Sequence, residues 1–134
     1  MEADPSEKAI MHYLQKGVGY VAKEGEDVVG VYVLLPTRPY TIELVNIAVA
    51  SFYRGKGIGK KLVSHAISIS REEGYHTMEV GTGNSSAEPL MLYQKCGFRI
   101  KGVDIDYFPK HYEEKIVENG IECRDMIRLS RELK

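Results

Sequence analysis

The sequence predicts a mixed α/β fold in a single domain spanning residues 1–134. Three observations support this prediction. The chain has 134 residues, of which 43% are hydrophobic and 28% charged, an ordinary composition for a globular protein with a real core. Short β-rich runs bounded by turn signals alternate with stretches of helical periodicity. After an opening helix, the order of these elements is β-β-β-α-β-α-β-β, without repeats or low-complexity tracts.

The first elements are predicted to be a helix and three strands. The helix covers residues 4–17, with Ser6 as its N-cap and Gly17 as its stop. Residues 18–24 and 27–36 are β-rich runs separated by "GED", a hairpin signal. The sequence "TRP" then ends the second strand. Residues 40–50 form a third strand, whose nearly all-apolar second half predicts a strand buried on both faces.

A helix, a strand and a second helix are predicted next. An apolar stripe indicates a helix that Gly74 ends; it comprises Ile58, Leu62, Val63, Ala66, Ile67 and Ile69. Residues 76–83 follow as a strand. The next helix is predicted over residues 87–97, but two sequence signals place its first residue differently. Ser85 and Glu88 fit a capping box, whereas Pro89 prefers a position in the first turn.

Two strands, over residues 98–108 and 121–130, are predicted to complete the chain. Residues 109–120 join them as a short helix or loop that ends in an Asn-Gly turn.

Composition argues against several functional classes. The net charge is −1, so no global basic field attracts nucleic acid or an anionic membrane. No apolar run approaches the ~20 residues that span a bilayer, and the first residues are acidic rather than signal-like. Cys96 and Cys123 have no metal-binding spacing and fit reduced thiols of a cytoplasmic protein. The four histidines also lack metal-ligand spacing, so no metal is expected.

The stretch "YRGKGIGKKL" at residues 53–62 indicates an anion site, because it exposes backbone N–H groups at the start of a helix. No Gly-Lys pair is followed by Ser or Thr, which disfavours a P-loop. The even spacing of Gly55, Gly57 and Gly59 also disfavours the G-x-G-x-x-G dinucleotide fingerprint. What remains is the pattern [Q/R]-x-x-G-x-[G/A] directly after a strand.

That pattern, with the blocks "ELVNIAVASFYRGKGIGKKL" and "MEVGTGNSSAEPLMLYQKCGF" in this order, resembles the GNAT family of acetyl-CoA-dependent N-acetyltransferases. The resemblance covers roughly residues 18–130. It implies a mostly antiparallel central sheet flanked by helices. It also implies acetyl-CoA as acetyl donor and a primary amine of a small molecule or protein as acceptor, which attacks the thioester directly in a ternary complex. A catalytically silent acyl-CoA-binding or regulatory module on the same fold is the alternative.

The resemblance implies the cofactor-binding residues. The glycine loop would wrap the pyrophosphate, the end of the preceding strand would pair with the pantetheine arm through its backbone, and Asn84 would reach the arm from the next strand. Asn84 could instead cap the following helix. The implied residues are Ile47, Ala48, Val49, Arg54, Gly55, Lys56, Gly57, Ile58, Gly59, Lys60 and Asn84.

The resemblance also implies the catalytic residues. Tyr93 in "LYQKCGF" matches the tyrosine that serves as general acid, although it could be a core aromatic. Glu43 and Glu79 occupy positions that different family members use for the base, and each could be an ordinary surface carboxylate. Glu43 is favoured, because a charge in an apolar strand is costly unless it is solvated, paired or functional.

Family members usually begin with a strand and a helical segment before the hairpin. This chain starts at what resembles the second of their helices, so either the fold lacks the first strand or the domain is N-terminally shortened. The strand over residues 18–23 would then be a sheet edge, which a second copy of the chain could cover as a homodimer.

Overall fold

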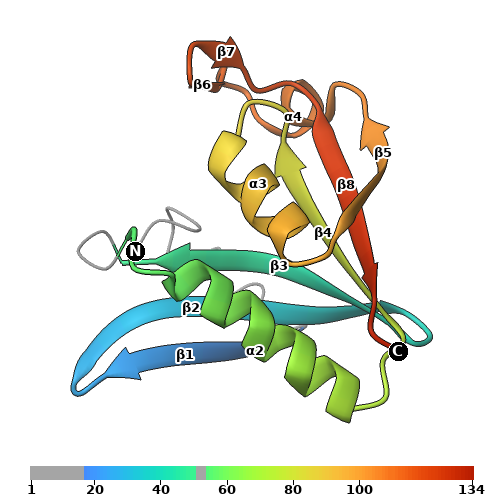
Figure 1. Ribbon diagram of the computed structural model, residues 1–134. Coiled ribbons are helices and arrows are strands. Elements are labelled where there is room, and N and C mark those ends of the chain that lie inside the picture. Colours follow the sequence, from blue (N-terminus) through green and yellow to red (C-terminus); the bar gives the residue numbers. More distant parts are fainter. Residues whose placement is uncertain (1–16, 51–53) are drawn as a thin grey trace. The chain divides into compact units, whose positions relative to one another are not determined.

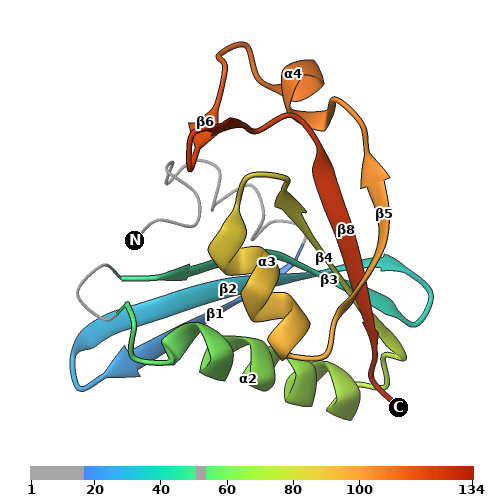
Figure 2. The same cartoon turned by 45° about the horizontal axis from the view of Figure 1, so that its top comes forward.

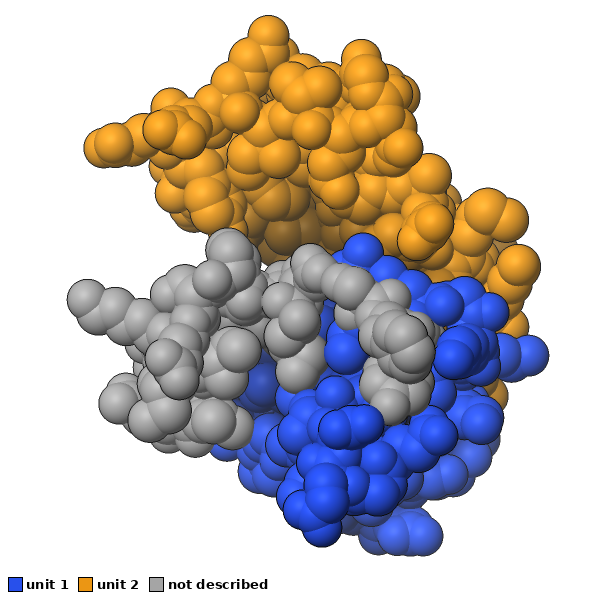
Figure 3. Space-filling view, turned by 90° about the vertical axis from the view of Figure 1, so that its left-hand side faces the viewer, with its two compact units in different colours: residues 1–78, 132–134 blue, residues 79–131 orange. Residues whose placement is uncertain are grey.

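The computed structural model describes residues 17–50 and 54–134, apart from the side chain of Asn46. Within it the chain forms two compact units (Figure 3). Unit 1 comprises residues 1–78 and 132–134, and unit 2 comprises residues 79–131. The helix expected over residues 4–17 lies almost entirely outside the described residues.

Unit 1 contains an antiparallel meander of three strands. β1 (Val18–Glu24), β2 (Asp27–Arg38) and β3 (Thr41–Val49) are neighbours in this order. The β1–β2 turn confirms the hairpin predicted from "GED". A bulge between Ala22 and Lys23 interrupts the register of this hairpin. The first three predicted strands are therefore confirmed.

The predicted end of the second strand is wrong. β2 continues through Pro36 to Arg38, opposite Ile42 and Thr41 of β3. The register of the β2–β3 ladder shifts between Pro36 and Arg38. A proline has no N–H to donate, and such an irregularity next to the turn is where a strand tolerates it.

The helix α2 (Ile58–Glu72) lies along one face of the β1–β3 strands, as both ribbon views show (Figures 1 and 2). Most of the predicted apolar stripe is buried, namely Leu62, Val63, Ala66 and Ile67. The helix approaches the sheet closely at Gly30, where an added Cβ would lie 2.7 Å from Leu62 Cδ1 and 3.1 Å from the Ala48 carbonyl oxygen. A side chain at position 30 would therefore require the Leu62 side chain to move.

β3 is buried on one face and half-buried on the other, so the prediction of a strand buried on both faces holds for one face. Ile42, Leu44 and Ala48 are buried. Glu43 and the alternate residues that the structure describes are half-buried. This burial explains why the strand carries few polar residues.

Unit 2 contains most of β4 (Thr77–Gly83), together with β8 (Met126–Glu132) and β5 (Arg99–Asp104), which are neighbours in that order. β5 runs antiparallel to β8. The helix α3 (Ala87–Lys95) runs beside these strands in both ribbon views (Figures 1 and 2). The chain thus has the predicted class, a mixed α/β fold with mostly antiparallel strands and flanking helices.

Three local predictions in unit 2 need correction. The strand expected over residues 98–108 ends at Asp104 of β5, and a helix begins at Tyr107. Ser86 is the N-cap residue of α3, so the Ser85–Glu88 capping box does not form, and Pro89 lies in the first turn as its preference predicted. The single strand expected over residues 121–130 is divided. β7 (Ile121–Glu122) ends before Cys123, and β8 begins only at Met126.

The connection between β5 and β8 contains the short helix α4 (Tyr107–His111) and a two-stranded hairpin of β6 (Val117–Glu118) with β7. Asn119 and Gly120 join the two strands, and both have positive φ. This confirms the predicted Asn-Gly turn. Across residues 17–50 and 54–134, no helix has the length and apolar character that a bilayer crossing requires.

Candidate active site

The glycine loop forms the N-terminal end of α2. Gly55 and Gly57 have φ of 78° and 77°, and Gly57 is the N-cap residue of the helix. Such backbone angles strain any residue with a side chain, above all a β-branched one. A Cβ at either position would meet nothing within 4 Å, so the loop is open on the side of these glycines.

The first turn of α2 is suited to an anion. No side chain of the described residues caps it, and it contains no acidic residue. The first N–H groups of a helix have no partner inside the helix, and they carry the positive end of its dipole. Lys60 in this turn is exposed, as are Arg54 and Lys56 in the loop before it. Ile58 and Gly59 are half-buried, and their backbone N–H groups belong to this first turn.

The strand segment before the loop is Ile47, Ala48 and Val49 in β3. On one edge these residues pair with Tyr32, Val31 and Gly30 of β2. Ala48 is buried, whereas Ile47 and Val49 are half-buried. Their side chains are apolar, so any polar contact that they make with a cofactor has to use the backbone.

Asn84 is bound to the backbone of the segment between β7 and β8. Its Oδ1 accepts the N–H groups of Arg124 and Asp125 at 2.8 and 2.9 Å. Its Nδ2 donates to the Glu122 carbonyl oxygen at 3.1 Å. Because the N–H groups of Arg124 and Asp125 are used in these bonds, residues 123–125 do not continue a strand, which explains the break between β7 and β8. The side chain makes no capping bond to α3.

Tyr93 projects from α3 and is buried, with 4% of its surface exposed. Its ring packs against Phe98 with centroids 5.8 Å apart and planes at 60°. Burial, with a smaller contribution from Cys96, raises the pKa of Tyr93 to about 12. The phenol therefore keeps its proton at neutral pH, as a general acid must, although packing alone would also bury the ring.

The two candidate bases differ in their surroundings. Glu43 lies in β3 between the buried Ile42 and Leu44 and is half-buried itself. Glu79 lies in β4, where Lys101 of β5 forms an ion pair with it at 2.9 Å. The side chain of Glu79 is 17% exposed. Local sequence patterns could not indicate this ammonium, because Lys101 belongs to a different strand.

The predicted site residues are divided between the two units. Glu43, the segment Ile47–Val49 and the glycine loop belong to unit 1, whereas Glu79, Asn84 and Tyr93 belong to unit 2. Both cysteines are buried free thiols. In the part of the chain that the structure describes, no three His, Cys, Asp or Glu side chains gather as metal ligands.

Another polar cluster in unit 1 was missed by the sequence analysis. The hydroxyl of the buried Tyr32 lies 2.5 Å from His65 Nδ1, and Tyr20 stacks on the Tyr32 ring. The three residues come from β1, β2 and α2. Only the register of the hairpin, with Tyr20 opposite Tyr32, could have hinted at it.

Comparison with known proteins identifies the family. The model of the Acetyltransferase (GNAT) family matches residues 2–98. An uncharacterized N-acetyltransferase of Bacillus subtilis, YvbK, is 55% identical over 127 residues, which are 95% of this chain and 82% of that protein.

Two solved structures are similar over nearly the whole chain. A Bacillus subtilis acetyltransferase in complex with CoA has a TM-score of 0.94 and 54% identity, covering 98% of this chain and 87% of that one. A GNAT family acetyltransferase from Elizabethkingia anophelis with acetyl-CoA bound has a TM-score of 0.92 and 45% identity, covering 97% and 85%. The chain is an acetyltransferase and belongs to the GNAT family.

Proposed function

We propose that this acetyltransferase transfers the acetyl group of acetyl-CoA to a primary amine by direct attack in a ternary complex. The start of α2 is the observation that carries the proposal. Two glycines with positive φ lead into a 15-residue helix whose first turn has neither an acidic residue nor, among the described residues, a side-chain cap. The two similar structures with CoA and acetyl-CoA bound support the choice of cofactor.

The residues present fit a pyrophosphate. The free N–H groups of Ile58, Gly59 and Lys60 would donate to its oxygens, and the helix dipole would add a favourable field. The open space at Gly55 and Gly57 would let the backbone approach the phosphates. The exposed cations of Arg54, Lys56 and Lys60 would raise the local concentration of a polyanion, although salt screens this term.

The pantetheine arm would be held by backbone groups of Ile47, Ala48 and Val49. Asn84 has one Nδ2 hydrogen beyond the bonds that tie it to residues 122–125, and this hydrogen would serve the arm. Asn84 would therefore both fix the β7–β8 connection and contact the cofactor.

Bound acetyl-CoA would supply an activated thioester carbonyl. The chain has to provide an acceptor for the proton of the attacking amine and a donor for the departing sulfur. We assign the first role to Glu43, with Glu79 as the second candidate, and the second role to Tyr93. Since the pKa of Tyr93 is about 12, the phenol is a weak acid that supports the sulfur mainly by donating a hydrogen bond as charge develops.

The test is release of free thiol from acetyl-CoA across a panel of primary amines, from small amines and amino acids to peptides. We expect at least one amine to give saturable turnover. Tight binding of coenzyme A without transfer to any amine would favour the silent binding module. The two free buried thiols, Cys96 and Cys123, fit the reducing cytoplasm that we propose as its location.

A further inference from the structure

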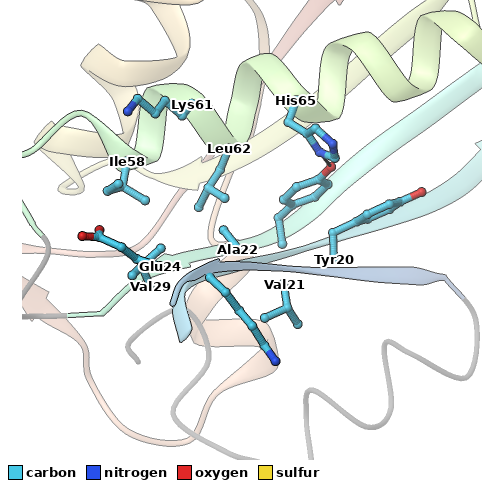
Figure 4. Close-up of a pocket in the computed structure, with 11 residues that line it drawn as sticks. Tyr20, Val21, Ala22, Glu24, Val29, Ile58, Lys61, Leu62 and His65 are labelled. Atoms are coloured by element: carbon cyan, nitrogen blue, oxygen red, sulfur yellow. Dashed lines mark hydrogen bonds between the residues drawn. The ribbon is translucent and has the colours of Figure 1, made fainter. Parts of the chain in front are cut away.

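Unit 1 contains a cavity of about 500 Å³ between the β1–β2 hairpin and the first turns of α2, which we call the β1–α2 pocket. Figure 4 shows Ile58, Leu62 and His65 pointing from α2 toward the hairpin, and Tyr20 and Ala22 on the side of β1 that faces the helix. The volume lies within the range of ~300–1,000 Å³ that is typical of small-molecule sites. Apart from Ile58, no residue of the expected cofactor site lines it.

The floor and one wall of the pocket are apolar and flat. Val29 and Leu62 are both 4% exposed and line the floor. The rings of Tyr20 and Tyr32 stack with centroids 4.9 Å apart and planes at 15°. Tyr32 is 1% exposed, so Tyr20 presents the aromatic surface that a ligand can reach. A flat aromatic body placed against Tyr20 would bury apolar area and gain offset or edge contacts.

The bulge between Ala22 and Lys23 lies in the same wall. Up to Ala22 the β1–β2 register is regular, and after the bulge it shifts so that Lys23 lies opposite Val28. Ala22, whose side chain is a single methyl group, thus stands beside space that a larger residue would fill. Bulges are frequent next to binding sites because they re-aim side chains.

A hydrogen-bond donor lies at one end of the pocket. The pKa of Tyr32 is raised by burial and by Tyr20, so its phenol stays protonated and can donate to His65 Nδ1. A neutral imidazole with Nδ1 as acceptor carries its hydrogen on Nε2. His65 is exposed, and the described residues give its Nε2 no hydrogen-bond partner. With Tyr32 as the donor in this contact, His65 offers Nε2–H to an acceptor on a ligand.

The charges around the pocket favour an anion. Lys23 and Lys61 line it against a single acid, Glu24. The Lys61 side chain extends toward the start of α2, away from His65 (Figure 4). Neither lysine has an ion-pair partner among the described residues. The lining residues thus carry a net positive charge, which favours an anion as a long-range effect.

We propose that the β1–α2 pocket binds a small aromatic carboxylate, with its rings against Tyr20 and its carboxylate at His65 Nε2–H. This is a second ligand site of the protein. It lies within unit 1 and is separate from the glycine loop.

The probe is 2-naphthoate, titrated into the full chain without coenzyme A and followed by backbone NMR shifts and calorimetry. We expect saturable binding, with shifts confined to β1, the facing part of β2 and the first turns of α2. The matched cation 2-(aminomethyl)naphthalene should bind at least about fivefold more weakly, because it has no acceptor for His65 and meets two lysines.

Variants test each contact. His65→Phe keeps an aromatic ring but removes the donor, and should weaken naphthoate binding about fivefold. Lys61→Met should weaken it about twofold and Glu24→Gln should strengthen it slightly, because both charges are solvated. Ala22→Leu should block binding by filling the cavity. Lys95→Met, on an exposed position of α3 in unit 2, removes a cation from elsewhere and should change nothing.

Thermal melting checks that each variant is folded. The proposal is overturned if naphthoate fails to saturate, if the cation binds as well as the anion, or if Ala22→Leu binds normally while folded. Displacement of naphthoate by coenzyme A, together with shifts in residues 54–60, would also overturn it, because the probe would then occupy the cofactor loop.

Discussion

Lys101 Nζ lies 2.9 Å from Glu79 Oε2, so one of the two candidate bases is already held by an ammonium. An incoming amine or its proton has to compete with this partner. Glu43 lies instead in an apolar strand between Ile42 and Leu44. Glu79 would have to give up this ion pair to act as the base, and Glu43 stays the first candidate because its strand is otherwise apolar.

Exchange of Glu43 for glutamine should lower the rate of acetyl transfer mainly at acidic to neutral pH. There the amine arrives protonated and needs a proton acceptor, whereas at higher pH it arrives free and activity should recover in part. Glu79→Gln should reduce the rate little, and Lys101→Met serves as the control for loss of the ion pair. The pH–rate profiles of the three variants decide the assignment. A large, pH-dependent loss in Glu79→Gln with a normal Glu43→Gln would reverse it.

Exchange of Gly57 for valine should weaken coenzyme A binding far more than Lys61→Ala. The valine strains the backbone at φ 77° and puts a branched side chain where the phosphates would approach, whereas the alanine removes one screened charge. Gly25→Val is the matched control, since Gly25 has φ 63°, equally open surroundings and a position in the β1–β2 turn. Calorimetry should show equal binding by Gly25→Val and the wild type. Equal loss in both glycine variants would mean that only backbone strain had been measured.

Exchange of Tyr93 for phenylalanine keeps the ring and its contact with Phe98 while removing the hydroxyl. If the phenol assists departure of the thiol, kcat should fall by ~10²–10⁴-fold. Coenzyme A affinity and the melting temperature should change little. Steady-state kinetics, calorimetry and thermal melting separate the two roles. Activity within about twofold of the wild type would make Tyr93 a packing residue.

Alkaline pH should destabilise the fold between about pH 10 and 12. The pKa of Tyr93 is raised from 10.0 to about 12, and that of Tyr32 is raised further in the same direction. Below pH 10 both states keep the phenols protonated and stability is unaffected. Above it the unfolded chain ionises first, so the free energy of unfolding falls until the folded phenols ionise as well. Urea unfolding across this range should show a shallower decline in Tyr93→Phe, and an unchanged slope would contradict the prediction.

The outer edge of β1 should mediate a homodimer. Among the described strands β1 pairs with β2 alone, and its Val18 and Val21 are 56% and 58% exposed. Unpaired strand edges with apolar side chains tend to associate. Light scattering should report a dimer, and Val21→Lys should shift it toward monomer. Val103→Lys on β5, the edge strand at the other end of the strand order, is the control. A monomeric wild type would refute the proposal.

Local sequence signals predicted most of the fold. The spacing of Leu62, Val63, Ala66 and Ile67 predicts α2, and Asn119-Gly120 predicts the β6–β7 turn. The divided last strand could not be predicted, because Asn84, some 40 residues earlier in the chain, takes the N–H groups of Arg124 and Asp125. The same holds for the site. The glycine loop is local, but the partner of Glu79 and the Tyr32–His65 contact depend on how separate elements pack.

The close approach of α2 to Gly30 has a consequence for how the family can vary. Since a methyl group at position 30 would lie 2.7 Å from Leu62 Cδ1, the two positions share one volume. Gly30→Ala or a larger residue at position 62 alone would overfill it, whereas Gly30→Ala with Leu62→Val would restore the sum. We therefore expect positions 30 and 62 to change together during evolution. A larger residue at position 30 of β2 should be accompanied by a smaller residue at position 62, about one turn into α2.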